Sequence, residues 1–500
     1  MKQPVFKLAV LPVLAALVLA GCSLAPKYER PVAPVPQQFP DYGKEAASTD
    51  TDTSAQSSAD LGWREFFRDP QLLALIDIAL ANNRDLRIAA QRVQEARAQY
   101  GIQQSEQLPT FGVGGTATHT RNPQALRMNP DSPSVSRVYQ AGVGITSFEL
   151  DFFGRIRNLT EAARQAYLAT EQAQRTVHIG LVAGVAEGYF NLRAAEQQYD
   201  LAQKTLVSRQ NSMDIVQARF DAGVAGALDL NQARSQLETV RADLSEIQRA
   251  QAQAQNALRV LLGEQPPVDI PRAAVFGKDQ LLASIPVGLP SDLLTRRPDI
   301  IGAEHTLMGA NANIGAARAA FFPNISITGL LGFASPAMGG LFSSSNKFWT
   351  YSPQLTVPLF SGGVSGNLDL AEARKNIAVA QYEKTIQVAF REVADALAGE
   401  ATYSHQLDAL RALEDSAAKT VDIARMRYEN GIDSFLQVQS AEVSLYSAQR
   451  QFVQTGLASL MNRVELYKAL GGGWNETSLV ETADTGAETA GTGQTTPNAS

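Results

Sequence analysis

The sequence contains very little cysteine and histidine. One cysteine and four histidines occur among 500 residues, which excludes an internal disulfide and a thiolate metal cage. The net charge is −7, so the basic excess of a general nucleic-acid binder is missing and no nucleic-acid partner is expected. No run of 18 or more apolar residues occurs, so no helix should span a bilayer. Membrane β-strands leave a weaker pattern, which composition does not exclude.

The N-terminus has the features of an export signal. Two lysines precede an apolar run at residues 8–20, which is too short to span a membrane. The only cysteine, Cys22, follows Gly21 and completes what looks like a bacterial lipobox, Leu-Ala-Gly-Cys at 19–22. This predicts removal of residues 1–21 as a lipoprotein signal peptide and attachment of lipid to Cys22. Ser23, where an Asp would favour inner-membrane retention, indicates the outer membrane of a Gram-negative bacterium.

Proline-rich and polar segments divide the rest of the chain. Residues 22–61 carry five prolines and then a Ser/Thr/Asp stretch, which predicts an extended or disordered tether behind the lipid. Residues 264–287 are rich in proline and predict a linker. Residues 475–500 have few apolar groups and predict a disordered tail. The folded parts are therefore expected at 62–263 and 288–474.

These two folded parts repeat one another. Arg-Phe-Asp-Ala-Gly-Val at 219–224 matches Arg-Tyr-Glu-Asn-Gly-Ile at 427–432, at an offset of 208 residues. The same offset aligns the Leu-Gly pairs at 262–263 and 470–471. Such a period is too long for a solenoid unit and indicates one duplication. Each half is expected to run helix, strand, loop, strand, long helix, turn, helix.

The helical stretches predict a tall molecule. Residues 155–219 and 363–427 number 65 each, and at 1.5 Å per residue each would span about 98 Å. The stretches 69–107 and 227–262 would span about 58 and 54 Å, so stacked end to end they would flank one long helix. Residues 227–262 also carry apolar residues at alternating three- and four-residue spacing, as in a coiled-coil seam. A soluble helical bundle would show the same periodicity.

Between the helices, apolar and polar residues alternate. We expect β-hairpins at about 108–153 and 322–361, with strands long enough to cross a bilayer at a tilt. A soluble antiparallel sheet would give the same alternation, but the lipobox favours the membrane. Four strands cannot close a barrel, and lipid does not tolerate an open edge. Three chains would give twelve strands and a conducting lumen, whereas eight strands from two chains would be filled by side chains.

Four stretches carry a resemblance to a known family: residues 149–155, 288–299, 314–323 and 467–474. Together they resemble the TolC family of outer-membrane efflux proteins, in particular its lipid-anchored OprM-like (NodT-type) branch. The resemblance implies a mixed α and β membrane protein whose internally duplicated protomer supplies four strands to a trimeric 12-stranded β-barrel. The long helices would form a periplasmic 12-helix α-barrel.

The resemblance also implies a function and partners. The homotrimer would be the outer-membrane channel of a tripartite pump, together with a periplasmic adaptor (membrane fusion protein) and an inner-membrane RND transporter. It would passively conduct drugs and other amphiphiles, without enzymatic activity and without a cofactor beyond the lipid. Type I protein secretion and metal-ion efflux are the alternatives within the family. A structural periplasmic coiled-coil lipoprotein is the alternative outside it.

The resemblance assigns the helix–turn–helix tips to adaptor docking, through Gly223 and Val224 in the first repeat and Gly431 and Ile432 in the second. Glycine at such a position also fits a plain helix C-cap, and the two roles are compatible.

Residues just past the tips should ring a closed periplasmic aperture that opens like an iris. Asp229 matches an acidic position of the family and Leu436 a hydrophobic plug position. Relatives often carry Asp at the positions of Gln437 and Ser440, so a second acidic ring is in doubt. The remaining candidates are Asp433, as a compensating acid, and Arg427 and Tyr428, as ties that hold the tip shut. Each of these would otherwise be an ordinary surface residue.

Overall fold

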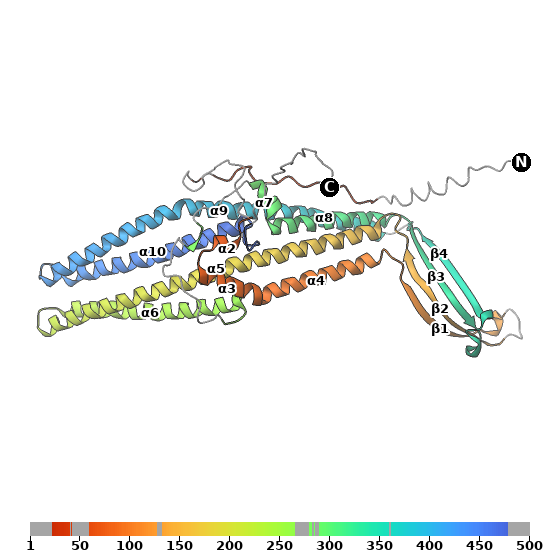
Figure 1. Ribbon diagram of the computed structural model, residues 1–500, viewed down its shortest axis with the longest axis horizontal. Coiled ribbons are helices and arrows are strands. Elements are labelled where there is room, and N and C mark those ends of the chain that lie inside the picture. The colour runs from red at the N-terminus through yellow and green to blue at the C-terminus, as the bar shows by residue number, and fades with distance from the viewer. Residues whose placement is uncertain are drawn as a thin grey trace, which may run out of the picture.

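The computed structural model describes residues 23–40, 42, 60–127, 133–265, 280–282, 285, 290–359 and 362–478. The molecule is long and narrow, with helices along most of its length and a sheet at one end (Figure 1). The expected lipidation site, Cys22, lies outside the described residues, as do most of the expected linker and tail.

From its first strand onward, each repeat has the strand, loop, strand, long helix, turn and helix that the sequence predicts. The first repeat comprises α2 (Trp63–Phe66), α3 (Pro70–Asn82), α4 (Arg84–Ser105), β1 (Phe111–Arg121), η1 (Gln124–Leu126), β2 (Val135–Glu149), α5 (Arg155–Asp221) and α6 (Ala227–Leu262). The second comprises α7 (Pro290–Arg296), α8 (Pro298–Ala319), β3 (Asn324–Ser335), η3 (Met338–Gly340), η4 (Ser344–Asn346), β4 (Lys347–Thr356), α9 (Gly362–Glu429) and α10 (Phe435–Ala469). The mixed α and β fold with an internal duplication is confirmed.

The expected single helix over 69–107 is wrong, because Asn83 divides it into α3 and α4. Its side-chain oxygen accepts a hydrogen bond from the backbone N–H of Leu86 at 2.9 Å, which caps α4. Its amide nitrogen donates to the carbonyl oxygen of Leu261 at 2.8 Å. The break therefore lies against the end of α6, where both polar groups of a buried Asn side chain are satisfied.

The four strands form one antiparallel sheet in the order β1-β2-β3-β4. Its strands project from the helices at the end of the molecule opposite the helical turns (Figure 1). The register pairs Val113 with Val143, Val143 with Leu331 and Leu331 with Trp349. Residues paired in this way point to the same face, so one face of the sheet is apolar across all four strands. Within the described chain, β1 and β4 each keep one edge without a neighbouring strand.

The long helices set the height of the molecule. α5 has 67 residues and α9 has 68, so each is about 100 Å long at 1.5 Å per residue. The hairpins α5–α6 and α9–α10 end at the same extremity, away from the sheet (Figure 1). None of the described helices is long and apolar enough to cross a membrane.

An aromatic core joins the two repeats at mid-height. Phe66 of α2 stacks on Tyr467 of α10 with ring centroids 4.0 Å apart, and Phe67 meets the same ring edge-on. The backbone N–H groups of Trp63 and Arg64 donate to the carbonyl oxygens of Asn475 and Glu476. The expected disordered tail therefore does not begin at 475, because residues 475–478 are hydrogen-bonded to this core.

The segment after the expected lipidation site lies against the helices. Arg30 forms a bidentate ion pair with Glu304 of α8, with Nε 2.7 Å from Oε1 and Nη2 2.8 Å from Oε2. The Tyr28 hydroxyl donates to the same carboxylate. Farther along, Phe39 stacks on Phe390 of α9. The described part of the expected tether, residues 23–40, is thus extended but fastened to the second repeat.

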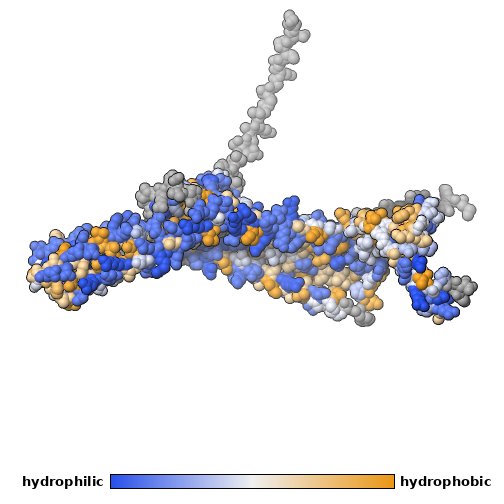
Figure 2. Space-filling model, turned by 90° about the horizontal axis from the view of Figure 1, so that it is seen from below, coloured by the Kyte–Doolittle hydropathy of each residue, from blue (hydrophilic) through white to orange (hydrophobic). Residues whose placement is uncertain are grey.

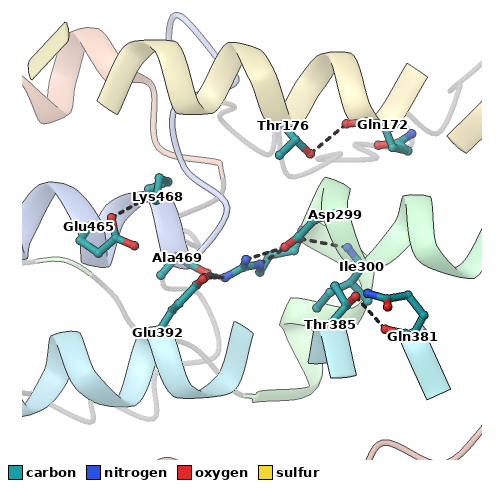
Figure 3. Close-up of polar contacts among 11 residues, drawn as sticks. Gln172, Thr176, Asp299, Ile300, Gln381, Thr385, Glu392, Glu465, Lys468 and Ala469 are labelled. Atoms are coloured by element: carbon teal, nitrogen blue, oxygen red, sulfur yellow. Dashed lines mark hydrogen bonds and ion pairs between the residues drawn. The ribbon is translucent and has the colours of Figure 1, made fainter. Parts of the chain in front are cut away.

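Arg297 fastens the second repeat at the same level. Its guanidinium donates to Asp299 at the start of α8, to Glu392 of α9, and to the carbonyl oxygen of Ala469 at the end of α10 (Figure 3). The Arg297 side chain is largely buried, so these three acceptors replace its water. The Arg-Arg-Pro-Asp stretch that contributes to the family resemblance therefore has a structural task.

Candidate aperture at the helical tips

The two helical turns have the same backbone geometry. Gly223 and Gly431 both have φ of +71°, in the left-handed region that favours glycine. In each turn the next residue donates back into the helix, Val224 N–H to Arg219 O at 2.8 Å and Ile432 N–H to Arg427 O at 2.9 Å. These bonds satisfy carbonyl groups at the helix ends. The duplication therefore preserves the tips as well as the helices.

The tips carry exposed apolar side chains. Val224 is 66% exposed and Ile432 is 62% exposed, and Leu228 and Leu436 are exposed in the helical turns that follow. Figure 2 shows hydrophobic surface at this end among the polar surface of the helices. A gathered set of exposed apolar residues rimmed by polar ones is typical of a contact with another protein chain.

Within the second tip, Arg427 and Asp433 form an ion pair. Arg427 Nε lies 2.6 Å from Asp433 Oδ2, and Nη2 lies 3.1 Å from Oδ1. The hydrogen bonds from this guanidinium lower the pKa of the Asp433 carboxyl below its usual value. Asp433 is therefore occupied by an internal partner rather than presented as an isolated acid.

The corresponding arginine of the first repeat, Arg219, contacts a residue of the second repeat. Arg219 has Ala225 where Arg427 has Asp433, so its own tip offers no carboxylate at that position. Its guanidinium carbon instead lies 4.5 Å from the centroid of the Tyr428 ring, and Nη1 donates to the Tyr428 carbonyl oxygen at 3.4 Å. Tyr428 also packs on Phe435, and its buried hydroxyl has no hydrogen-bond partner within the described structure. Burial raises the pKa of this hydroxyl.

The remaining candidates lie in the first turns beyond the tips. Asp229 is half-buried in the first turn of α6, and Leu436 and Gln437 are exposed in the first turn of α10. Ser440 follows one turn later and is also exposed. The structure places them all at the tip end but assigns them no partner that would define an aperture within one protomer.

A buried charge cluster above the tips was missed by the sequence analysis. Glu442 of α10 accepts hydrogen bonds from Arg209 of α5 and from Arg425 of α9, the latter at 2.6 and 3.1 Å. Arg209 is 4% exposed and Glu442 is 5% exposed. Burial lowers the pKa of the Arg209 guanidinium, and the Glu442 carboxylate opposes this shift. The only sequence signal is that Glu442 stands where the first repeat has Arg234.

A hollow lies between this cluster and the tip. Its volume is about 140 Å³, and it separates part of α5 from the α9–α10 hairpin. Its lining mixes polar and apolar side chains: Ser208, Asn211, Ser212, Ile215, Arg425, Tyr428, Glu429, Phe435 and Val438. Close packing between α5 and the second hairpin is therefore incomplete at this level.

Metal ligands do not gather in the described residues, where no group of three His, Cys, Asp or Glu side chains could hold an ion.

Comparison with known proteins gives a consistent result. Residues 75–264 and 289–472 match the family model described as outer membrane efflux protein. The chain is 45% identical over 462 residues to the probable efflux pump outer membrane protein TtgC of Pseudomonas putida, covering 92% of this chain and 94% of that protein. It is 44% identical over 469 residues to the cation efflux system protein CusC of Escherichia coli, covering 93% and 99%.

Solved structures of outer-membrane proteins have the same fold as this chain. A membrane protein from Pseudomonas aeruginosa superimposes with a TM-score of 0.83 at 43% identity, covering 90% of this chain and all of that one. The open state of the MtrE outer membrane channel of Neisseria gonorrhoeae gives a TM-score of 0.81 at 36% identity, covering 92% and 100%.

Proposed function

This chain belongs to the outer membrane efflux protein family, and from that premise we propose that it is the outer-membrane channel of a tripartite RND-type pump. The observation that carries the proposal is the distance between two surfaces. An apolar sheet face stands at one end, and exposed apolar helical tips stand at the other, with helices of about 100 Å between them. Such a protein can connect the outer membrane with a partner deep in the periplasm.

Three copies complete the channel. One chain supplies four strands with two open edges, and an open edge is not tolerated in lipid. Three sheets joined edge to edge give a closed barrel of twelve strands, wide enough to leave a lumen. The hairpins α5–α6 and α9–α10 then supply the 12-helix barrel below it. A periplasmic adaptor and an inner-membrane RND transporter complete the pump.

The channel conducts and does not catalyse. Energy and substrate choice belong to the transporter, and the channel needs no cofactor. Relatives of 44% identity include a toluene efflux pump protein of Pseudomonas putida and the cation efflux protein CusC. We favour drugs and other amphiphiles as cargo, because the seven methionines are not clustered along the sequence as a soft-metal path would require.

Lipid on Cys22 anchors each protomer in the outer membrane. The export signal and the position of the only cysteine support this. The fastened segment that follows, held through Arg30 and Glu304, would keep the anchored end beside the second repeat.

The helical tips form the gate. Gly223, Val224, Gly431 and Ile432 shape and present the surface that docks the adaptor. Around the three-fold axis, exposed side chains would narrow the closed aperture, and the contacts of Arg427 and Tyr428 would hold it. Opening is then an outward swing of the tips when the adaptor and transporter bind. The residues proposed to narrow the aperture are Asp229, Asp433, Leu436, Gln437 and Ser440.

Planar-bilayer recording tests the channel directly. The purified trimer should insert and conduct in small steps, since the tips are closed without partners. A deletion strain should become susceptible to amphiphilic drugs or solvents and regain resistance with the wild-type gene. Susceptibility only to metal ions would favour metal-ion efflux. A protein that never conducts and stays soluble as Cys22→Ser would instead be a structural lipoprotein.

A further inference from the structure

The apolar face of the sheet ends in basic residues. The register pairs His119 with Arg137 and Phe333 with Lys347, in line with the apolar pairs farther down the strands. Arg121 lies two residues beyond His119 in β1 and therefore on the same face. The His119 ring meets the Tyr139 ring edge-on at 5.6 Å, which places these side chains together on that face.

This face is the one that meets lipid in the proposed barrel. Val113 is 85% exposed and Trp349 is 74% exposed in the protomer. The opposite face carries Thr118, Gln140 and Gln354, which suit a water-filled lumen. In a barrel the apolar face must be outside, so the basic residues at its end also point outward.

The basic residues occupy the strand ends far from the helices. β1 leaves the helical end after α4 and finishes at Arg121, and β4 begins at Lys347 on its return. The helices and tips lie toward the periplasm, so these strand ends meet the outer leaflet. Arg121, Arg137 and Lys347 therefore stand where an apolar membrane band gives way to headgroups.

Acidic residues are scarce at this level. In the sequence, the hairpin segment 107–148 contains one acidic residue, Asp131, which lies outside the described residues. The hairpin segment 322–361 contains none. Elsewhere the chain pairs its arginines with carboxylates repeatedly, as at Arg297 and Arg427. The strand ends thus keep a local positive charge in a protein whose net charge is −7.

The basic residues are spread along the strand ends, so they suit several phosphate groups rather than one. His119 and Arg137 face each other across adjacent strands, about 5 Å apart at their Cβ atoms. Lys347 lies two strands from Arg137 and, by the register, level with Ala141, which is four residues farther along β2, so the two are roughly 17 Å apart. When three sheets close, β4 of one protomer adjoins β1 of the next, which brings Lys347 toward the neighbouring Arg121. Guanidinium groups bind phosphate oxygens in pairs.

We propose that Arg121, Arg137 and Lys347, with His119 beside them, form a basic collar that binds the phosphate groups of outer-leaflet lipid. The collar rests on the proposed function, since it needs the sheet to close in the outer membrane. Its task is to hold the trimer at a fixed depth, with acyl chains on the apolar band and phosphates on the collar.

The test uses the full-length trimer, stripped of lipid in detergent, and native mass spectrometry. The wild type should bind lipid A carrying its phosphates at least about tenfold more tightly than lipid A from which they have been removed. Inorganic phosphate alone should bind far more weakly, because it lacks acyl chains. Equal affinity for the two lipids would overturn the proposal without any variant, and tight binding of inorganic phosphate would exclude lipid as the source of the phosphate.

The variant Arg121→Gln, Arg137→Gln, Lys347→Gln should lose this preference while remaining trimeric. The matched control removes the same charges from exposed helical positions far from the sheet, as Arg234→Gln, Arg249→Gln, Lys419→Gln, and should bind as the wild type does. A collar variant that still prefers phosphorylated lipid would refute the assignment of these residues. Planar-bilayer conductance separates the two proposals, since a failed collar leaves a conducting trimer and a failed channel does not conduct.

Discussion

Arg219 and Tyr428 join the two repeats at their tips, although each belongs to a turn with the same backbone. The arginine lies over the ring at 4.5 Å because Ala225 offers it no carboxylate. Arg427, its counterpart, is held by Asp433 inside its own turn. The difference between Ala225 and Asp433 thus explains why Arg427 pairs within its own tip whereas Arg219 contacts the tip of the other repeat.

Breaking the tie should favour opening. Arg219→Ala removes a cation–π contact worth about 0.5–1 kcal/mol, so the open-to-closed ratio should rise about two- to fivefold in single-channel recordings. Arg219→Lys should give a smaller rise, because it keeps the charge but loses the planar stacking.

Ala225→Asp offers a sharper check on the same tie. The new carboxylate would supply to Arg219 the partner that Asp433 supplies to Arg427, and so draw it away from Tyr428. Opening should increase although no group has been removed. An unchanged ratio in both Arg219→Ala and Ala225→Asp would show that this contact does not restrain the tips.

The Arg427–Asp433 pair should affect gating and leave stability alone. The Arg427 side chain is 49% exposed and the Asp433 side chain 27% exposed, and ion pairs open to solvent contribute little to folding. Asp433→Asn should therefore leave the thermal midpoint unchanged while raising open probability, because the turn loses its internal brace. A drop in the midpoint with unchanged gating would reverse this assignment.

The pH dependence of this pair follows from the direction of its shift. The pKa of Asp433 is lowered in the folded protein, so the restraint that its ion pair places on the turn is complete above the ordinary Asp pKa of about 3.9 and is lost as the pH falls through the lower folded value. The difference between wild type and Asp433→Asn should stay constant from about pH 5 to 8. A difference that changes within that range would assign the gating effect to another group.

Substitution of Glu442 should lower the thermal stability far more than substitution of Asp433. Glu442→Gln leaves Arg209 buried without its counter-charge, and breaking a buried pair destabilises by about 3–5 kcal/mol. Thermal unfolding followed by circular dichroism should show a large fall in midpoint. The control is Glu400→Gln, which disrupts the less buried Arg463–Glu400 pair between α9 and α10 and should lower the midpoint less. Arg209→Met with Glu442→Leu should recover most of the loss, since apolar replacements need no partner.

Leu436 and Asp229 test the constriction. Leu436 is exposed and Asp229 is half-buried in the protomer, so both side chains can face a shared axis. The double variant Leu436→Ala, Asp229→Ala should increase conductance, because it widens the aperture and removes its charge. Leu228→Ala, at the first-repeat counterpart of Leu436, distinguishes a general loss of tip packing from a specific effect. Unchanged conductance in the double variant would exclude these residues from the narrowest point.

The sequence predicted the helices and strands well where periodicity and duplication agreed. The long helices, the tips at Gly223 and Gly431 and the sheet alternation all rest on local patterns. The break at Asn83 was missed, although an Asn two residues before an Asp is a recognisable helix start. The helix also breaks here because of a tertiary contact, since the Asn83 side chain donates a hydrogen bond to the end of α6.

Contacts between distant segments were not predictable. Arg209 and Glu442 are 233 residues apart, and Arg30 and Glu304 are 274 apart. Nothing in the local composition distinguishes these charges from the solvated ones around them. The repeat even argues against the first pair, since the residue that corresponds to Glu442 is Arg234. Only the packing of α5 against the second hairpin brings these groups together.

The near-identical lengths of α5 and α9 place both helical tips at the same distance from the sheet. Each residue adds 1.5 Å and turns the helix by about 100°, so an inserted residue would shift one tip against the other and rotate every side chain beyond it. An unmatched insertion would separate Arg219 from Tyr428 and displace Glu442 from its arginines together. The number of residues in these two helices therefore sets how far the tips reach toward an adaptor in the periplasm. An insertion or deletion in one repeat has to be matched by an equal one in the other.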